Sequence, residues 1–247
     1  MSISPKDILN NKKNINKRVN INDINLNNIS INDLEYHGDN YHEFINLMSL
    51  LENVTTCQIS DAFRSITNRS CSLYSIKSIN NRKVWGTVFT VETSCDDWGT
   101  STLAIDAAKE GDILLFKVDS ENSAIWGEIA SKCALKKGIK ATVIYGSARD
   151  LDVLLYSDYP IFAGNYCPNA GSPLGLGTLG EPIEIDGVKI ESGDFLFGDE
   201  NGIAVIPKTM FKDTMDATVS VKIKENTILS KINDGMSLAE ILNLKKK

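Results

Sequence analysis

Two nearby segments carry residues that could do chemistry on a small anion: Trp126-Gly-Glu-Ile-Ala130 and Tyr145-Gly-Ser-Ala-Arg-Asp150. The guanidinium of Arg149 is planar and offers paired N–H donors, which match a carboxylate or the oxygen of an oxo or enolate group. The carboxylate of Asp150 is a ligand that hard cations such as Mg²⁺ or Mn²⁺ prefer. We therefore predict a small metal-dependent site centred on Arg149 and Asp150.

The first segment is predicted to lie in the opening turn of a helix. Amide N–H groups in that turn lack partners within the helix, and together with the helix dipole they favour a bound carboxylate. Gly127 also allows a ligand to approach the backbone closely. A cation, a guanidinium and helix amides would together stabilise an enolate, which forms when a bond next to a 2-oxo group breaks. We therefore expect the stretch from Trp126 to Pro207 to handle a small 2-oxo acid.

A plainer interpretation of these residues stays open. An Arg-Asp pair in a loop is most often an exposed ion pair or part of a turn. A glutamate at a helix start, such as Glu128, also suits the helix dipole without any further role. From the residues alone, the plainer interpretation is the more common one.

Histidine and cysteine usage narrows the chemistry that the main body can perform. The two histidines are His37 and His42, so the chain beyond residue 55 cannot build a Ser-His-Asp triad, a Cys-His pair or a histidine-ligated zinc site. The five cysteines are widely spaced and form no C-x-x-C motif. This pattern favours reduced thiols over a disulfide framework or a zinc site.

Charge and hydropathy indicate the partners and the compartment. The net charge is −6 and the isoelectric point is about 5.1, which argues against nucleic acid or an anionic membrane as the main partner. The N-terminal residues never become an apolar run, and no window approaches the length of a membrane span. The sequence therefore predicts a cytoplasmic protein with no nucleic-acid or membrane partner.

The elements that must position the site alternate between strand and helix. Two helices are expected first, one over Tyr41–Leu51 and one that begins at Thr55 or Thr56. The following strand–helix–strand–helix–strand order indicates a partly parallel sheet. Arg149 and Asp150 then follow the carboxyl end of a buried strand, where ligands bind in open α/β sheets. The five elements are expected over residues 84–93, 101–110, 112–118, 124–137 and 140–145.

The second half of the chain is predicted to be mainly β. Asp186-Gly187 is a hairpin turn signal between short strands, and an amphipathic helix over Lys208–Leu244 is expected to break near Asp234-Gly235. We expect one mixed α/β domain over residues 41–247, preceded by an Asn-rich extension over residues 1–40. Strands in this half are expected over residues 160–163, 184–190, 195–198 and 203–206.

The segment Gly175-Leu-Gly-Thr-Leu-Gly180 matches the G-x-G-x-x-G nucleotide pattern literally. A dinucleotide fingerprint must follow a strand and open a helix. Here the pattern follows a loop-like segment and precedes Glu181-Pro182 and a strand, so no helix start is available for a pyrophosphate. We predict instead a flexible loop beside a site, or a contact between subunits.

Segments between Thr55 and Pro207 resemble, in order, the ribonuclease-regulator-A-like (RraA-like) family, which includes the 4-hydroxy-4-methyl-2-oxoglutarate aldolases. In the aldolase branch, an acidic residue, twenty intervening residues and an Arg-Asp pair mark the site; Glu128, residues 129–148 and Arg149-Asp150 reproduce that spacing. The segments that carry the resemblance are Ile59-Ser-Asp-Ala62, Gly86-Thr-Val-Phe-Thr-Val91, Glu110-Gly-Asp-Ile-Leu-Leu115, the two segments above, Tyr159-Pro-Ile-Phe-Ala163 and Ile185-Asp-Gly-Val-Lys-Ile to Pro207.

The resemblance implies an α/β fold, a swivelling β/β/α sandwich with a partly parallel sheet, an antiparallel β half and C-terminal helices. It implies a lyase that cleaves 4-hydroxy-4-methyl-2-oxoglutarate-type substrates by aldol chemistry or decarboxylates oxaloacetate through a pyruvate enolate. It further implies a homotrimer or homohexamer with sites between subunits and an acidic residue supplied by a neighbour. The implied roles are Asp150 as ligand of Mg²⁺ or Mn²⁺, Arg149 on the oxo and carboxylate oxygens, the amides of Gly127, Glu128, Ile129 and Ala130 on the carboxylate, and the Glu128 side chain on metal-bound water.

This sequence departs from the aldolase pattern at two positions. Glu128 stands where the best-known aldolases of the family carry Asp, and Ala130 stands where Leu is usual. One alternative is a non-catalytic regulator of ribonuclease activity that acts by protein–protein binding. Another is a methyltransferase, although no glycine-rich nucleotide loop lies between an early strand and helix.

Four further acidic residues lie in family-like segments. We interpret them as helix-start, turn and strand-end residues and not as metal ligands, because such positions favour carboxylates for local hydrogen bonding. They are Asp61, Asp112, Asp194 and Asp199.

Overall fold

The computed structural model of the protein describes residues 49–244. Residues Asn53–Lys247 form one compact unit, to which the sheet and the helices below belong. Residues 49–53 are helical, and they include the last residues of the helix predicted over Tyr41–Leu51. The Asn-rich extension predicted over residues 1–40, its boundary with the domain and the rest of that helix lie outside the described residues.

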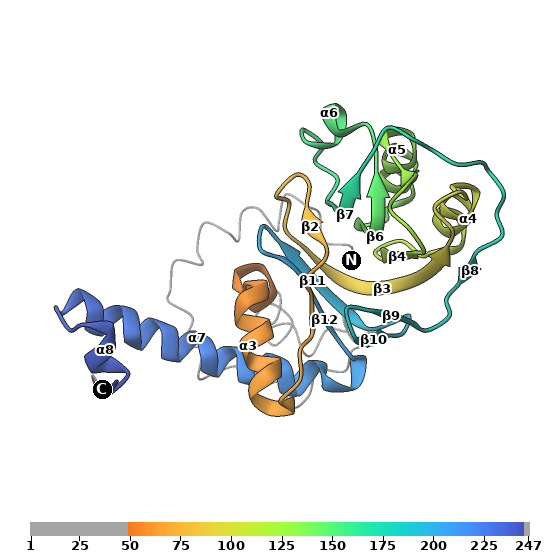
Figure 1. Cartoon of the computed structure of the whole chain (residues 1–247). Coiled ribbons are helices and arrows are strands. Elements are labelled where there is room, and N and C mark those ends of the chain that lie inside the picture. Colours follow the sequence, from red (N-terminus) through yellow and green to blue (C-terminus); the bar gives the residue numbers. More distant parts are fainter. Residues whose placement is uncertain (1–48, 245–247) are drawn as a thin grey trace, which may run out of the picture. The chain divides into compact units, whose positions relative to one another are not determined.

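One long strand, β3 (Val84–Thr93), joins a parallel and an antiparallel half of the main sheet (Figure 1). Its first residues pair antiparallel with β11 (Phe195–Asp199), and its last six pair in parallel with β4 (Ile113–Val118). The partly parallel sheet with an antiparallel half is therefore confirmed. The full order is β1 (Ser72–Leu73), β12 (Gly202–Ile206), β11, β3, β4, β6 (Ala141–Ala148), β7 (Ile161–Tyr166) and β2 (Lys77–Ser78), with β5 (Ala124–Trp126) on β6 and β8 (Thr178–Leu179) on β3.

Two helices cover the parallel strands, and two others lie with the antiparallel strands (Figure 1). α4 (Gly99–Ala107) connects β3 to β4, and α5 (Glu128–Lys137) connects β5 to β6. α3 (Thr56–Thr67) packs along α7 (Phe211–Asn233). The short elements are α6 (Leu151–Leu154), η6 (Lys208–Met210) and α8 (Leu238–Ile241).

The parallel strands are buried on both faces, which explains their continuous apolar runs. In β4, Leu114 and Phe116 join the cluster that includes Ala104 of α4 and Ala134 of α5. The alternate residues Ile113 and Leu115 join a second cluster with Leu196, Ile203 and Val205 of the antiparallel strands. Because side chains alternate between the faces of a strand, these clusters lie on opposite faces of the sheet. The layers are therefore helices, parallel strands and antiparallel strands, which is the β/β/α sandwich that was expected.

Local signals placed several elements correctly. Thr55 is the N-cap of α3 and forms a capping box with Gln58, each donating to the other at 3.2 Å. The turn between β9 (Ile183–Ile185) and β10 (Val188–Ile190) has Asp186 at φ 51° and Gly187 at φ 78°, the left-handed pair that a type I′ hairpin requires. α7 ends at Asn233, one residue before the predicted break at Asp234-Gly235.

The prediction of a helix over Ala124–Lys137 places the first residue of that helix too early. Residues Ala124–Trp126 form β5, which pairs in parallel with Ser147 and Ala148 of β6, and α5 begins at Glu128. The three strand residues are buried, and pairing with β6 satisfies backbone groups that a helix would have satisfied internally. The end of this helix is confirmed, because Gly138 caps it at φ 85°.

The bounds of α4 and β6 also differ from the prediction. α4 begins at Gly99 and ends at Ala107, not at Ser101 and Glu110. β6 continues to Ala148, beyond the predicted end at Tyr145. Arg149 therefore follows the strand directly, without an intervening loop.

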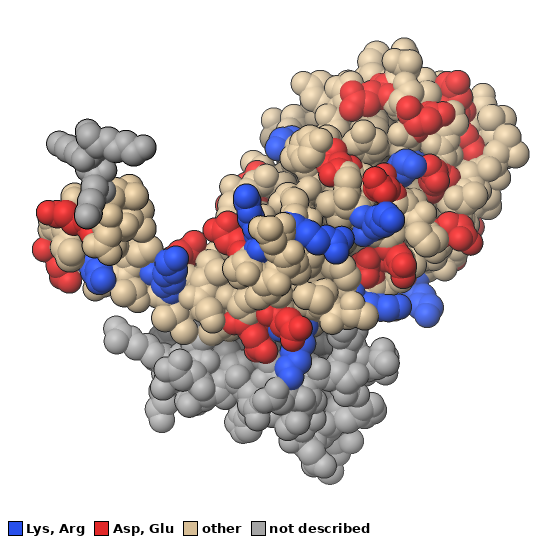
Figure 2. All heavy atoms as spheres, turned by 60° about the horizontal axis from the view of Figure 1, so that its bottom comes forward, with Lys and Arg blue, Asp and Glu red and all other residues tan. Residues whose placement is uncertain are grey.

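Surface charge is mixed on the face drawn in Figure 2, where Lys and Arg side chains are interspersed with Asp and Glu. Within residues 49–244, no helix is long and apolar enough to cross a membrane.

Candidate active site at the start of helix α5

Arg149 and Asp150 leave the carboxyl end of β6 and turn into α6. The backbone N–H of Arg149 donates to the carbonyl of Trp126 at 2.9 Å, which fixes the strand end against the end of β5. Asp150 adopts a left-handed backbone conformation, φ 61° and ψ 40°, and is the N-cap residue of α6. Few residues other than glycine adopt this conformation, and aspartate tolerates it better than most. The turn aims the Asp150 side chain back toward the start of α5.

The Asp150 carboxylate lies directly against the first residues of α5. Its Oδ2 accepts a hydrogen bond of 2.9 Å from the backbone N–H of Glu128. Gly127, the N-cap residue, has space only for hydrogen on that side: an added Cβ would lie 2.4 Å from Oδ2 of Asp150 and 3.2 Å from Cγ of Arg149. Glycine is therefore needed at residue 127 for a steric reason, because the protein's own Asp150 carboxylate leaves no space for a side chain.

These residues line a cavity of about 360 Å³, within the size range of small-molecule sites. Of the predicted residues, the structure brings Gly127, Ile129, Ala130, Arg149 and Asp150 into its wall. Helix geometry leaves the amides of Ile129 and Ala130 without a carbonyl partner in the preceding turn of α5. The other lining residues are Trp98, Ser101, Thr102, Ile105, Asp106, Ala124, Ile125, Trp126, Cys133 and Ala170.

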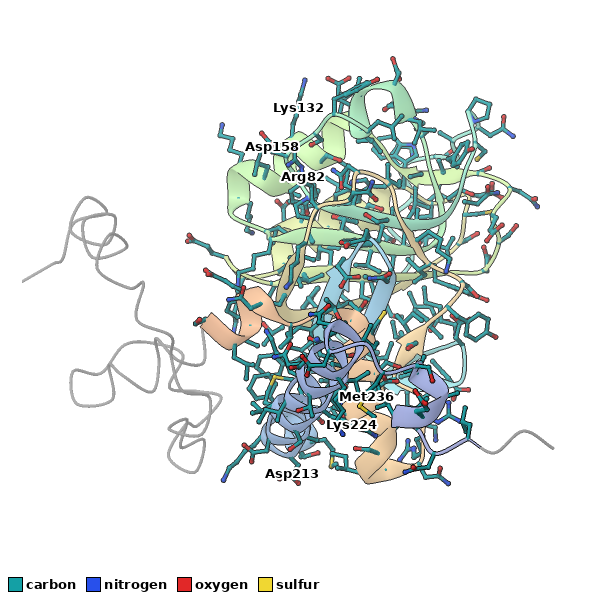
Figure 3. All side chains as sticks on the ribbon, turned by 90° about the vertical axis from the view of Figure 1, so that its left-hand side faces the viewer. Arg82, Lys132, Asp158, Asp213, Lys224 and Met236 are labelled. Carbon is teal, nitrogen blue, oxygen red and sulfur yellow. The ribbon has the colours of Figure 1, made fainter. Side chains whose placement is uncertain are left out.

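The side chain of Glu128 does not join this wall. Its carboxylate pairs with Lys132 one turn later on α5 and lines a separate, smaller pocket. Lys132 is 72% exposed and lies at the edge of the unit, at the end opposite Asp213 and Lys224 of α7 (Figure 3). In this arrangement Glu128 reaches the site through its backbone N–H, and the water-orienting role of its carboxylate stays a prediction.

Trp126 forms a rigid part of the cavity wall. Its indole N–H donates to Oγ of Ser131 at 2.9 Å, and that hydroxyl donates to the carbonyl of Gly127 at 2.8 Å. The ring packs against Phe116 with 5.5 Å between ring centroids. Because Trp126 and Ser131 are buried, this hydrogen-bonded chain holds the start of α5 in register with the end of β5.

Sequence reasoning missed Trp98, which forms the wall of the cavity on the side of α4. Trp98 is the residue before α4, and its indole N–H donates to the carbonyl of Gly171 at 3.1 Å. Its backbone N–H donates to the carbonyl of Ser172 at the same distance. The contacts join residues more than seventy positions apart, so no local motif identifies them.

The glycine-rich loop is held by Asp97, a second residue that sequence reasoning missed. The buried Asp97 carboxylate accepts hydrogen bonds from the backbone N–H groups of Leu174, Gly175 and Leu176 at 2.7–3.0 Å, and from the hydroxyl of Thr100 at 2.7 Å. Burial raises the pKa of Asp97, but the hydrogen bonds from Thr100 and the loop outweigh it, so the pKa lies well below its usual value. The loop therefore binds a carboxylate of its own chain.

The glycines of this region serve close packing. A Cβ on Gly99 would lie 2.6 Å from the backbone of Pro173, and one on Gly177 would lie 2.4 Å from the carbonyl oxygen of Glu92. The loop passes over the start of α4 and continues into β8, without opening a helix. The segment Gly175–Gly180 therefore opens no helix, as predicted, and its Thr178 and Leu179 form β8; a flexible loop beside a site, or a contact between subunits, stays a prediction.

Asp150 offers suitable chemistry for a hard divalent cation. One of its oxygens is held by Glu128, while Oδ1 lies 3.8 Å from Nε of Arg149 and the side chain is 37% exposed. Among residues 49–244, no three His, Cys, Asp or Glu side chains are grouped to hold a metal. Mg²⁺ is commonly bound by one or two carboxylates plus water and substrate oxygens, so a single aspartate in an open cavity fits it.

Three of the other acidic residues have structural partners. Asp199 accepts from the N–H and hydroxyl of Thr56 at 2.8 and 2.7 Å. Asp194 accepts from the backbone N–H of Lys208 at 2.9 Å, and Asp112 from that of Lys109 at 2.9 Å. These contacts agree with the turn and helix-start roles predicted for them.

Comparison with known proteins identifies the family to which this chain belongs. The family model RraA-like: Aldolase/RraA matches residues 56–205, and the chain belongs to this family. "Uncharacterized protein MJ0644" of Methanocaldococcus jannaschii is 36% identical over 201 residues, which cover 80% of this chain and 94% of that protein. The "Putative 4-hydroxy-4-methyl-2-oxoglutarate aldolase" of Halalkalibacterium halodurans is 31% identical over 166 residues, 66% of this chain and 78% of that one.

Solved structures agree with this assignment. An uncharacterized protein from Pseudomonas syringae pv. tomato matches with a TM-score of 0.66 and 27% identity, over 78% of this chain and 96% of that chain. The RNA-processing inhibitor RraA from Thermus thermophilis matches with a TM-score of 0.55 and 22% identity, over 60% and 92%. The second likeness concerns the fold alone. Both the family resemblance and the fold class predicted from the sequence are confirmed.

Proposed function

We propose that the protein is a divalent-metal-dependent lyase that acts on small 2-oxo acids, by retro-aldol cleavage or by decarboxylation. The observation that supports this proposal is the shared wall of one cavity, in which Asp150, Arg149 and the start of α5 meet. The name of the Halalkalibacterium relative supports the aldolase chemistry. The spacing of Glu128 to the Arg-Asp pair supports it as well.

Each residue has a role that follows from its placement. The amides of Ile129 and Ala130 and the Arg149 guanidinium would hold the substrate carboxylate and the 2-oxo oxygen. Asp150 would hold Mg²⁺ or Mn²⁺, which when bound supplies a Lewis acid for the 2-oxo group. As the bond between carbons 3 and 4 breaks, negative charge grows on the 2-oxo oxygen, and Arg149 would stabilise it.

The test is metal-dependent release of pyruvate. The purified protein is supplied with oxaloacetate or with 4-hydroxy-2-oxo acids in Mg²⁺, in Mn²⁺ and in EDTA, and pyruvate is measured. We expect metal-stimulated release that falls at least about a hundredfold in Asp150→Asn, a variant that keeps an oxygen to accept the N–H of Glu128. Release that is absent in both metals, or unchanged in Asp150→Asn, would refute the proposal.

A second candidate function is regulation of a ribonuclease by protein–protein binding. The family description, which names both aldolases and RraA, supports it. Binding of a ribonuclease in a pull-down that Asp150→Asn leaves intact, with no pyruvate release, would favour regulation over lyase activity.

We also propose that the protein forms a homotrimer or homohexamer with sites between subunits and an acid from the neighbouring chain. Large apolar side chains near the cavity support an interface: Ile129 is 76% exposed, Leu103 is 47% exposed, and Leu103 lies against the loop at Gly175. Size-exclusion chromatography with light scattering measures the mass of the assembly directly. A monomeric mass would refute the assembly.

A further inference from the structure

One part of the cavity wall belongs to a segment that has no buried residues of its own. We call residues 169–177 the strap. The strap lies between β7 and β8 and contributes Ala170 to the cavity wall. No residue of the strap is buried within the chain. Because burial of apolar side chains contributes little to its position, hydrogen bonds must hold the strap in place.

The strap is tied to two parts of the cavity wall. At its start, the backbone N–H of Ala124 in β5 donates to the carbonyl of Asn169 at 2.9 Å. Further along, the indole and backbone N–H groups of Trp98 donate to the carbonyls of Gly171 and Ser172, both at 3.1 Å. Ala124 and Trp98 line the cavity themselves. The position of the strap and the position of this wall are therefore set together.

The carboxylate of Asp97 anchors the second half of the strap. It accepts hydrogen bonds from three consecutive backbone N–H groups of the strap, those of residues 174–176, at 2.7–3.0 Å. Thr100 completes the anchor, because its hydroxyl donates to Asp97 at 2.7 Å and accepts from the N–H of Gly177 at 2.8 Å. Asp97 and Thr100 are buried and do not line the cavity. These hydrogen bonds lie within one chain, so they do not require a neighbouring subunit.

We propose that Asp97 is a positioning residue for the candidate site, because it fixes the strap and thereby holds Trp98 and Ala170 in the cavity wall. This inference rests on the proposed lyase function and adds a residue that the substrate does not touch. Asp97 and Gly99 flank Trp98, and a Cβ on Gly99 would lie 2.6 Å from the backbone of Pro173 in the strap. Since the backbone on both sides of Trp98 contacts the strap, the indole cannot move independently of it.

Loss of the anchor should weaken substrate binding more than it slows bond breaking. Bond breaking is proposed to occur at Arg149 and Asp150, whereas Asp97 acts on the wall at Trp98 and Ala170. Contacts away from the breaking bond hold the substrate and the transition state alike, so their loss raises KM with little change in kcat. In Asp97→Asn an amide NH₂ group would face N–H donors. We expect this variant to raise KM at least about fivefold and to lower kcat less than about twofold.

Two variants of Thr100 test the anchor without removing a charge. Thr100→Val keeps the shape of the side chain but loses the hydroxyl that bonds to Asp97 and Gly177. Thr100→Ser keeps that hydroxyl. We expect KM to rise in Thr100→Val and to recover most of its wild-type value in Thr100→Ser. A KM that is unchanged in both Asp97→Asn and Thr100→Val would overturn the inference.

The matched control is Asp199→Asn. Asp97 and Asp199 are each 2% exposed, and Asp199 likewise accepts from a backbone N–H and a hydroxyl, those of Thr56, at 2.8 and 2.7 Å. Neither Asp199 nor Thr56 lines the cavity. Asp199→Asn should therefore reduce stability and leave KM unchanged. An equal rise of KM in Asp97→Asn and Asp199→Asn would assign the effect to general stability and overturn the role of Asp97.

Hydrogen exchange of the strap amides gives a readout that does not depend on catalysis. We expect the N–H groups of residues 174–176 to exchange at least about tenfold faster in Asp97→Asn than in the wild type, and not in Asp199→Asn. Unchanged exchange would show that another contact, such as a neighbouring subunit, holds the strap; it would overturn this inference and leave the lyase function intact. Absence of pyruvate release from the wild type would overturn the lyase function, and with it this inference.

Discussion

The backbone N–H of Glu128 donates a 2.9 Å hydrogen bond to Oδ2 of Asp150, a residue 22 positions later in the chain. This bond joins the start of α5 to the end of β6 and orients the carboxylate that is proposed to hold the metal. It depends on the backbone of residue 128 and not on its side chain. The twenty-residue spacing of the family pattern therefore corresponds here to a direct contact.

Replacement of Gly127 by alanine tests this contact. The new Cβ would lie 2.4 Å from Oδ2 of Asp150, so the carboxylate must move by several tenths of an ångström or more. We expect kcat/KM for pyruvate release to fall about a hundredfold, because small misplacements of reacting groups have effects of this size. The control is Gly187→Ala, at a hairpin turn with φ 78° and open space. It should lower stability by about 1–2 kcal/mol and leave activity unchanged. Full activity in Gly127→Ala would show that the close approach does not matter.

Removal of the Glu128 side chain separates its two possible roles. Glu128→Ala keeps the N–H that binds Asp150 but loses the carboxylate that pairs with Lys132. Because that carboxylate lies outside the cavity wall, we expect kcat to fall less than about tenfold in Glu128→Ala. Lys132→Ala should behave similarly, because an exposed ion pair contributes little to stability. A much larger loss in Glu128→Ala than in Lys132→Ala would instead support the predicted role in orienting water.

Much of the fold could be predicted because its signals are local. Thr55 and Gln58 are three residues apart, and Asp186 and Gly187 are adjacent, so the cap and the hairpin follow from short sequence motifs. The apolar run of β6 identified the strand that Arg149 follows. The meeting of Arg149 and Asp150 with the start of α5 was likewise predictable, because both residues follow a strand that ends beside that helix start.

The rest depends on contacts between distant residues. Ala124–Trp126 is an apolar run whose type is decided by pairing with β6, and periodicity cannot distinguish such a short strand from the start of a helix. Asp97 and the loop at Gly175 are 78 residues apart. The orientation of Glu128 was also beyond prediction, because both of its interpretations place it at the same helix start.

The Asp97 carboxylate should make the stability of the protein depend on pH. Because hydrogen bonds hold the pKa of Asp97 below its usual value in the folded state, its contribution is present above the unfolded pKa of about 3.9 and is lost as pH falls through the folded pKa. We expect Asp97→Asn to lower the free energy of unfolding by about 2–4 kcal/mol at pH 7, because its amide group would face N–H donors. Urea denaturation at pH 7, 5, 4 and 3 should show the difference from the wild type shrinking below about pH 4.

The control for Asp97 is Asp158→Asn. Asp158 pairs with Arg82 at 2.6 Å but is 91% exposed, and both side chains lie on the outside of the unit (Figure 3). This exposed pair should contribute little to stability at any pH. Equal losses of stability in Asp97→Asn and Asp158→Asn would contradict the assignment of the acid sensitivity to Asp97.

Ser131 should control the cavity wall without touching the substrate. Ser131→Ala leaves the buried indole N–H of Trp126 without its acceptor, which should cost about 1–3 kcal/mol of stability. The loosened wall should raise KM more than it lowers kcat and change the tryptophan emission. Ser131→Thr keeps the hydroxyl and should recover most of both. Ser220, whose hydroxyl donates to the carbonyl of Asp216 on exposed α7, makes the same type of helix contact far from the cavity. If Ser220→Ala raised KM as much as Ser131→Ala, the effect would be on general stability, and Ser131 would have no positioning role.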